Sequence, residues 1–216
     1  MFFGIYHELF CIFATMNDAK NSLFTYRKNA LAGSLGEPLC SEYNAKWRAC
    51  GGDKEKLFRL GVQRQSLPHL MTYARRGLGA TRDGLMTDFG GYINGKHTAI
   101  DVDGVGGGYT TQLYVGYESN VYEVADTMAF MWCDADIDIH ASKCPTLYVG
   151  CNTTLHLFLD GYNTISIYLF DNSKVVVEDA DVSCNVVVRK YSKECSVERG
   201  KYCLCGVKEH NKELRI

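Results

Sequence analysis

Features that mark several protein classes are missing from this chain of 216 residues. It holds only three prolines and 22% charged residues, without the strong bias that a collagen, a disordered chain or a coiled-coil rod requires. After the N-terminal stretch, no segment reaches the roughly 20 apolar residues of a membrane-spanning helix. The residues present, 46% hydrophobic and 12% aromatic, indicate a folded chain that can bury a sizeable core as one large domain or two small ones.

The usual motifs for metal ions and nucleotides are also missing. The ten cysteines include no Cys-X-X-Cys pair, and the one close pair, Cys203 and Cys205, alternates across a predicted strand. The glycines at positions 104 and 106–108 fit neither nucleotide-binding glycine motif, and the calcium-loop start at Asp101 lacks its later ligands. We therefore expect reduced, partly buried thiols, no metal ion and no cofactor.

The first sixteen residues are apolar but do not have the form of a secretory signal. Such a signal starts with Lys or Arg and continues as an unbroken apolar run, whereas the first cation here is Lys20, and His7 and Glu8 interrupt the run. Three interpretations stay open: a packed N-terminal segment, which we favour, a true start at Met16, and a signal or anchor. We expect a soluble protein that is not secreted through a recognisable signal peptide.

Two halves of opposite charge make up the net charge of −2. Residues 1–96 carry 13 Lys/Arg and 8 Asp/Glu, a balance of +5, whereas residues 97–216 carry 10 and 17, a balance of −7. Glycine clusters at residues 90–95 and 104–108 separate the halves, and the second half is rich in the Val, Ile, Tyr and Thr that suit strands. We expect a helical head over residues 1–95 and a β domain over residues 96–216.

Three short helices are expected in the head, each with a capping residue and an apolar stripe. Their predicted caps are Asp53, Ser66 and Thr81. Pro68 suits the first turn of the second helix, and Gly77 ends it. Each helix has about three turns or fewer and is marginal alone, so the helices must pack on each other or on the second half.

From residue 133 onward, runs of alternating apolar residues recur every ten or eleven residues. The runs are Ile137/Ile139, Leu147/Val149, Leu155/Leu157/Leu159, Ile165/Ile167/Leu169, Val175/Val177 and Val186/Val188. The turn residues Gly150, Gly161 and Asn172 keep a step of eleven, as do the cysteine pairs Cys133/Cys144 and Cys184/Cys195. Alternation buries one face of a strand, and a constant step predicts equivalent strands that stack.

Two architectures fit this repeat, a parallel β-solenoid and an antiparallel sandwich or meander. Hairpin signatures are sparse, with Asp160-Gly161 the one clear case, and stacked cysteines and a stacked series of Asn152, Asn163 and Asn172 suit coils better. We therefore favour a mainly β, α+β fold in which a small helical domain precedes a short solenoid (parallel β-helix) with two steps per coil. The C-terminal cations, among them Arg199 and Arg215, would cap its open end.

Five short motifs in residues 45–190 are familiar as an ordered set. They are Trp47-Arg48-Ala49, then Gly77-Leu78-Gly79, then Phe89 with Tyr92-Ile93-Asn94-Gly95, then Gly108-Tyr109-Thr110, and then Leu113-Tyr114-Val115. In this order the chain resembles a family of uncharacterised proteins encoded by phages and mobile elements of gut Bacteroides-type bacteria, which join a small helical head to β-repeats. The resemblance implies a phage-linked context, in the host cytoplasm or a virion, and brings no catalytic residues. The first forty residues and the cysteine content depart from the family pattern.

Two groups of charged residues are candidate sites. Asp134, Asp136 and Asp138 alternate along one predicted strand face, where carboxylates of polysaccharide-active solenoids also lie, although a solvated strand face is the simpler interpretation. The cations of the head are Arg59, Arg64, Arg75, Arg76 and Arg82, which could contact phosphates or an acidic protein surface. His140 and His156 lie near strands and are expected to be structural.

The expected function is a non-enzymatic structural or interaction protein, with the solenoid as a rigid platform for assembly or partner binding. Exposed strand rows favour protein partners, including further copies of the chain in a homo-oligomer or virion components, and no membrane. A carbohydrate-binding or carbohydrate-active solenoid is one alternative. Nucleic-acid binding through the basic head is the other, and it is not favoured.

Overall fold

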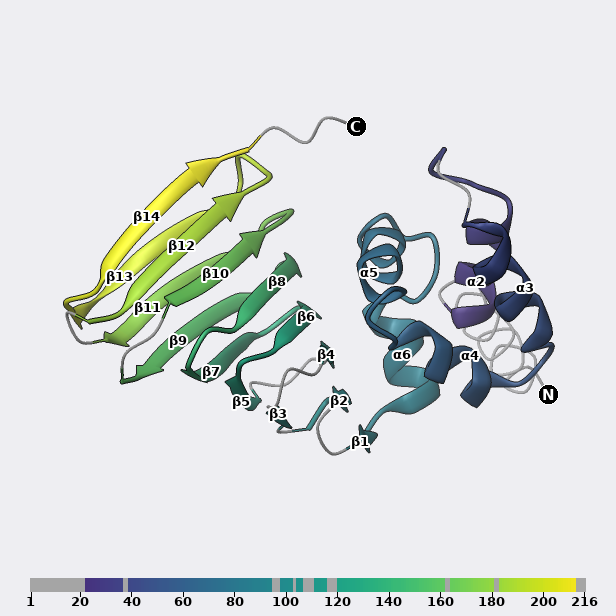
Figure 1. Ribbon diagram of the computed structural model, residues 1–216, viewed down its shortest axis with the longest axis horizontal. Helices are drawn as coiled ribbons and strands as arrows, with labels where there is room; N and C mark the ends of the chain where they lie inside the picture. The colour runs from purple at the N-terminus through teal and green to yellow at the C-terminus, as the bar shows by residue number, and fades with distance from the viewer. Residues whose placement is uncertain are drawn as a thin grey trace, which may run out of the picture. The chain divides into compact units, whose positions relative to one another are not determined.

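The structure is a computed structural model (Figure 1), and it describes residues 22–36, 39–94, 98–102, 104–106, 111–115, 120–161, 164–180 and 183–212. The expectations for residues 1–16, for Asn163 and for Arg215 lie outside these ranges. The chain divides into two compact units, Met1–Phe89 and Gly90–Ile216, so the division falls a few residues before the predicted position. In the part of the chain just defined, no helix is long and apolar enough to cross a membrane.

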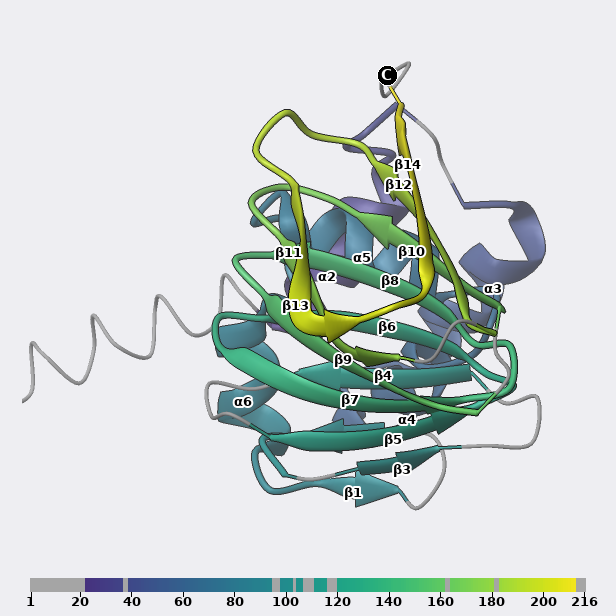
Figure 2. The same ribbon diagram turned by 90° about the vertical axis from the view of Figure 1, so that its left-hand side faces the viewer.

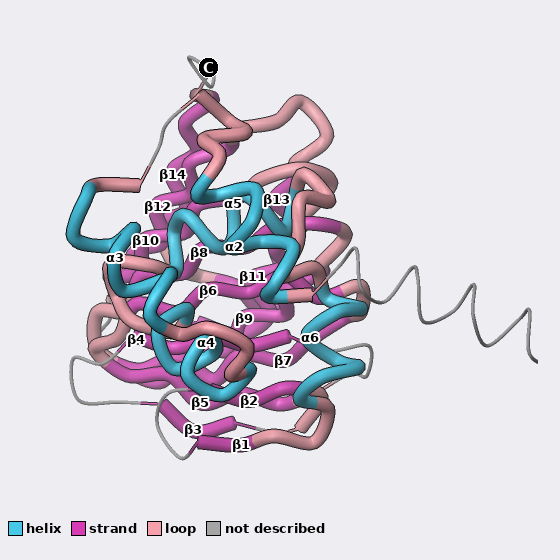
Figure 3. Tube along the Cα trace, turned by 90° about the vertical axis from the view of Figure 1, so that its right-hand side faces the viewer, coloured by secondary structure: helices cyan, strands magenta, loops and turns pink. Residues whose placement is uncertain are grey.

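Five helices form the described part of the first unit (Figure 3, cyan). They are α2 (Leu23–Leu31), α3 (Ser41–Ala49), α4 (Lys54–Gly61), α5 (Leu67–Arg75) and α6 (Arg82–Phe89). The three predicted helices are confirmed as α4, α5 and α6, and two predicted caps are correct: Asp53 accepts a hydrogen bond from the Lys56 amide at 3.0 Å, and Thr81 accepts one from the Gly84 amide at 3.3 Å. The Ser66 cap is wrong, because this buried residue has helical dihedral angles and makes no capping bond.

Aromatic side chains hold the helical unit together. The buried ring of Tyr26 on α2 meets Trp47 of α3 edge-on at 5.0 Å and Tyr73 of α5 at 5.4 Å between centroids. The Tyr26 hydroxyl lies 2.9 Å from Nδ1 of His69, so the one polar atom of the ring also has a partner. Edge-to-face contacts of this kind stabilise by about 0.5–1.5 kcal/mol beyond the area that they bury. Three short helices are thus joined around one phenol.

The second unit is the expected parallel β-solenoid, and the antiparallel alternative is excluded. Sheet A orders its eight strands as β1 (Ile93–Asn94), β2 (Thr98–Ile100), β4 (Thr111–Val115), β6 (Met128–Cys133), β8 (Thr146–Cys151), β10 (Thr164–Leu169), β12 (Asn185–Lys190) and β14 (Gly206–Asn211). Sheet B orders its six as β13 (Ser196–Cys203), β11 (Lys174–Ala180), β9 (Thr154–Asp160), β7 (Asp136–Ser142), β5 (Val121–Ala125) and β3 (Gly104–Gly106). Only the β1–β2 pair among these strands is antiparallel. Figure 2 shows the coils stacked from β1 to β14.

The alternating apolar residues face the interior between the two sheets, as predicted. From Ile137 to Val188, every member of the six predicted runs is buried in one hydrophobic cluster. Each of these side chains packs against its equivalents in the coils before and after, for example Ile167 between Leu147 and Val188 in register. Full burial of such a side chain stabilises by about 1.5–3 kcal/mol, so the interior column is the main source of stability in the solenoid.

The step of eleven residues is half a coil, and this corrects the predicted cysteine stacking. Cys133 is in register with Cys151 instead of Cys144, and Cys144 is exposed. Cys184 and Cys205 occupy equivalent corner positions, because the residues that follow them, Asn185 and Gly206, pair in register.

One column of sheet A measures the length of each coil. Its members are Thr98, Leu113, Phe130, Tyr148, Tyr168, Arg189 and His210, which are 15, 17, 18, 20, 21 and 21 residues apart. The strands of sheet B lengthen in the same direction, from 3 residues in β3 to 8 in β13. The solenoid therefore widens from its first coil to its last.

The last coil places charges in columns that are aliphatic in the coils before it. Arg199 continues the column of Leu157 and Val177, and Glu209 continues that of Val188. The guanidinium of Arg199 donates to the Val207 carbonyl at 3.2 Å, while Glu209 pairs with Lys190 at 2.9 Å. Inward-directed charges at a sheet edge oppose the addition of further strands. Of the cations expected to cap the solenoid, Arg199 occupies such a capping position.

Candidate functional site

The five candidate arginines of the head lie on three helices and the turns between them. Arg59 lies on α4 and Arg82 on α6, and both are engaged locally: the Arg59 guanidinium contacts Glu55 at 2.6 and 3.0 Å, and that of Arg82 contacts Asp83 at 3.1 and 3.3 Å. Arg64 and Arg76 are exposed in turns, and Arg75 ends α5 half-buried. Two of the five charges are thus offset by neighbouring carboxylates, which weakens the attraction that the set would exert on a phosphate backbone.

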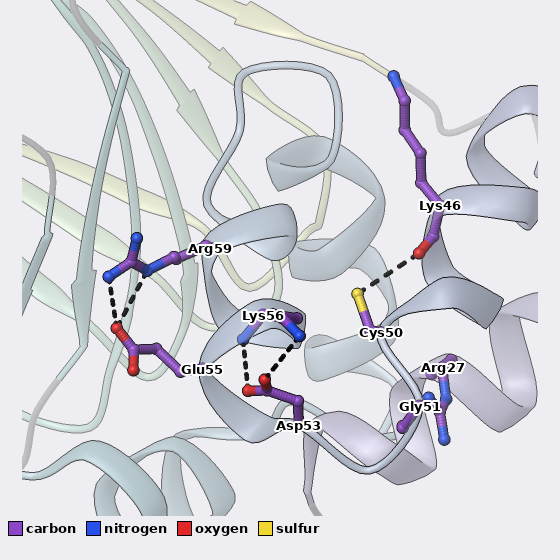
Figure 4. A network of polar contacts seen from close by, with 8 residues as sticks. All are labelled: Arg27, Lys46, Cys50, Gly51, Asp53, Glu55, Lys56 and Arg59. Atoms are coloured by element: carbon purple, nitrogen blue, oxygen red, sulfur yellow. Dashed lines mark hydrogen bonds and ion pairs between the residues drawn. The ribbon is translucent and has the colours of Figure 1, made fainter.

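Figure 4 shows how further cations of the head serve its local structure. Lys56 of α4 contacts the carboxylate of Asp53 through both its backbone amide and its ammonium group, at 3.0 and 3.2 Å. The hydrogen bond to the amide and the charge of Lys56 lower the pKa of the Asp53 carboxyl. A carboxylate at a helix N-terminus also interacts favourably with the helix dipole.

The turn between α3 and α4 is fixed by the other contacts in Figure 4. The Cys50 thiol donates to the Lys46 carbonyl at 3.4 Å, and Arg27 of α2 donates to the Gly51 carbonyl. These side chains satisfy carbonyl groups at the end of a helix, where no intrahelical donor is available. We assign this network to the stability of the helical unit.

The three candidate aspartates do not share one strand face, which corrects the prediction. Asp134 precedes β7 and lies in the turn, where its Oδ1 accepts a hydrogen bond from Asn152 Nδ2 at 2.8 Å. Asn152 Oδ1 in turn accepts from Asn172 Nδ2 at 3.0 Å, so the predicted asparagine stack is confirmed for these two residues and begins at Asp134. Asp136 and Asp138 lie on β7 and face outward from sheet B. The turn side chains of three successive coils therefore form a hydrogen-bonded ladder.

The outer face of sheet B combines carboxylates with the two histidines. Asp138 is in register with His156 on β9, whose Nδ1 lies 2.6 Å from Glu178 Oε1 on β11. His140 stacks on Phe158 at 4.9 Å between centroids. Neighbouring carboxylates hold His156 in one orientation, and they are also the groups that would stabilise its protonated form. Within the described ranges, no three His, Cys, Asp or Glu side chains form a group that could hold a metal ion.

Sheet A carries an aromatic ladder on its outer face, which the sequence reasoning missed. Phe130, Tyr148 and Tyr168 stack at 4.6 and 4.7 Å with interplanar angles of 5° and 13°, and the Arg189 guanidinium covers the far face of the ladder at 5.1 Å from Tyr168. The spacing of 18 and 20 residues between the aromatics was the available signal, at twice the step that was recognised. Since neighbours occupy the ring faces, the ladder presents ring edges to the outside, which suits stabilisation more than the stacking of a sugar or base.

Two large apolar side chains extend from the last corner of the solenoid. Tyr202, near the end of β13, and Leu204, just after it, are each 70% exposed. Lys201 Nζ lies 5.3 Å from the centroid of the Tyr202 ring. Next to a core in which the aliphatic residues are at or near full burial, this apolar corner (Tyr202 and Leu204) is the strongest mark of an external contact, because exposed apolar groups that lie together indicate interaction sites.

The fold and these surfaces define the class of the molecule: a short, tapered parallel β-solenoid preceded by a helical unit. Comparisons of the chain with protein-family models, with curated proteins and with solved structures find no match. The functional argument therefore rests on the molecule's own geometry.

Proposed function

We propose that this chain is a non-enzymatic interaction protein whose solenoid is a rigid platform and whose apolar corner binds a second copy of the chain. The observation that carries the proposal is the 70% exposure of both Tyr202 and Leu204 on a solenoid that otherwise buries its aliphatic residues. Burying such side chains in a contact is favourable at about 25 cal/mol per Å² of apolar surface.

Rigidity of the platform is supported by the ladders that connect successive coils. The aromatic ladder and the Asp134–Asn152–Asn172 ladder each join three coils through side chains in register. Because every rung is held from above and below, a load on one coil is passed to its neighbours. A platform of this kind holds a contact surface in one shape and lowers the conformational entropy lost on binding.

A second copy is the partner that best fits the charges around the apolar corner. The last coil bears both signs, with Lys193, Lys201 and Lys208 beside Glu194 and Glu198. An isologous contact brings the same patch from two copies together, so it needs both signs in one patch and an apolar centre. The corner offers few side chains, and interfaces below roughly 1,200 Å² are weak. We expect a weak, reversible homodimer.

The resemblance to proteins of phages and mobile elements supplies the proposed context. On that basis the protein acts in a bacterial host cytoplasm or in a virion, where it assembles with further copies or with virion components. The basis for this part of the proposal is the set of five motifs, which is independent of the apolar corner.

Multi-angle light scattering after size-exclusion chromatography, over a series of protein concentrations, tests the proposed self-association. We expect the mass of the wild-type chain to rise from 24.2 kDa toward twice that value with concentration. The double variant Tyr202→Ser, Leu204→Ser should stay monomeric. Val121→Ser is the matched control, since Val121 is 38% exposed on β5 in an early coil and should leave association unchanged. A wild-type chain that stays at 24.2 kDa throughout, or a double variant that associates as the wild type does, contradicts the proposal.

A further inference from the structure

Two thiols face each other beside the apolar corner. Cys203 is the last residue of β13, and Cys205 directly precedes β14, so the two side chains lie at the corner and not along one strand as predicted. Their sulfur atoms are 3.4 Å apart. Cys203 is half-buried, whereas Cys205 is buried and Leu204 between them is exposed.

The sulfur contact differs from the surroundings of other thiols in the protein. Cys50, Cys184 and Cys195 each direct Sγ at a backbone carbonyl, at 3.4, 2.8 and 3.5 Å. A disulfide has a sulfur–sulfur bond of 2.03–2.05 Å, so Cys203 and Cys205 need an approach of about 1.4 Å to reach it. Side-chain rotation at a corner, where the backbone changes direction between two strands, can supply part of this approach.

We propose that Cys203 and Cys205 form an oxidisable dithiol site, which a low-molecular-weight disulfide converts into an intramolecular disulfide. The Cys203 thiolate attacks the external disulfide and releases one small thiolate, which leaves a mixed disulfide on Cys203. The Cys205 thiol then loses its proton, attacks Cys203 Sγ and displaces the second small thiol. In total, two protein thiols and one small disulfide give one protein disulfide and two small thiols, so electrons and protons balance.

The order of attack follows from accessibility and charge. Cys203 is the more exposed sulfur and meets the external disulfide first. Burial and the neighbouring thiols of Cys203 and Cys184 raise the pKa of Cys205 to about 12, so Cys205 is almost entirely protonated at neutral pH. The thiolate is the nucleophile in exchange, and Cys205 therefore acts second, as the resolving thiol. The site is independent of the proposed self-association.

The full chain in mixtures of oxidised and reduced glutathione tests this site. After an acid quench, denaturation and alkylation, trypsin cleavage at Lys201 and Lys208 releases residues 202–208, a peptide with both thiols and no other cysteine. We expect this peptide to appear without alkyl groups and lighter by two hydrogen atoms than its dithiol form. In the native chain, the midpoint of oxidation should need about tenfold less oxidised glutathione than in urea, because the fold holds the sulfurs together.

Two single variants complete the experiment. With Cys205→Ser, Cys203 should accumulate as the mixed disulfide with glutathione, and with Cys203→Ser, Cys205 should still be alkylated after the same oxidation. A native chain whose peptide carries two alkyl groups or only glutathione overturns the proposal. A native midpoint at the same or higher oxidised glutathione than in urea does so as well, since the fold would then give the pair no advantage.

Discussion

Replacing the two inward charges of the last coil should open the end of the solenoid to association. The perturbation is Arg199→Val with Glu209→Val, which extends the columns of Leu157–Val177 and of Val188 by one aliphatic residue each. The variant is made in the Tyr202→Ser, Leu204→Ser background, so that the contact proposed at the apolar corner does not contribute to the result.

The expected size of the effect follows from the side chains that meet. Two last coils that face each other bury four new valines, at about 1.5–3 kcal/mol each, or about 6–12 kcal/mol in total. In the parent, the same contact would bury Arg199 and Glu209 away from water, at several kcal/mol per ion. Even the lower value of about 6 kcal/mol changes the association constant by more than about four powers of ten.

Light scattering over a concentration series measures this association, and circular dichroism checks that the variant keeps its strands. We expect the variant to form dimers or larger species at concentrations at which the parent is a monomer of 24.2 kDa. Arg199→Lys with Glu209→Asp keeps both charges and should remain monomeric. A folded valine variant that stays as monomeric as the parent would refute the assignment of these two residues as the cap.

Two further predictions concern glycine 79 and the buried tyrosines. A Cβ at Gly79, where φ is +107°, would lie 2.1 Å from the Tyr26 amide nitrogen, so Gly79→Ala should destabilise the helical unit by several-fold more than Gly77→Ala, which meets no atom within 4 Å and should lose about 1 kcal/mol, as read from thermal melts of Trp47 fluorescence. Burial raises the pKa of Tyr26, Tyr114 and Tyr122 well above 10.0, so the folded chain keeps these protons when the unfolded chain starts to lose them; the free energy of unfolding in urea should therefore fall as the pH rises above about 10, and a constant value there would contradict the shifts.

Much of the solenoid could be predicted because its interior writes directly into the sequence. Alternation at Ile137/Ile139 and Leu155/Leu157 requires a strand with one buried face, and the scarcity of hairpin turns favoured parallel coils. The period was read as a constant eleven because corners and strands both change length along the chain, which hides a true coil of 15 to 21 residues. Gly150, taken as a turn, lies in β8, since a strand can hold a glycine where packing leaves little room.

Helices α2 and α3 and the functional surfaces were beyond the sequence. Of the residues in α3 only Trp47 is buried, so its apolar stripe is too narrow to recognise. The apolar corner and the dithiol depend on where β13 ends, and element boundaries are the least predictable part of a fold. Asp134 was misplaced for the same reason, because β7 begins two residues later than the alternation indicated.

The taper of the solenoid makes each coil specific to its place in the chain. In a uniform repeat protein, one repeat can be deleted, duplicated or exchanged, since every interface is alike. Here adjacent coils differ by up to two residues in length, so a duplicated or exchanged coil would bring its corners out of step with the coil beside it. The protein therefore has a fixed number of coils in a fixed order, and its evolution by insertion or loss of whole coils is closed off in a way that substitution of single residues is not.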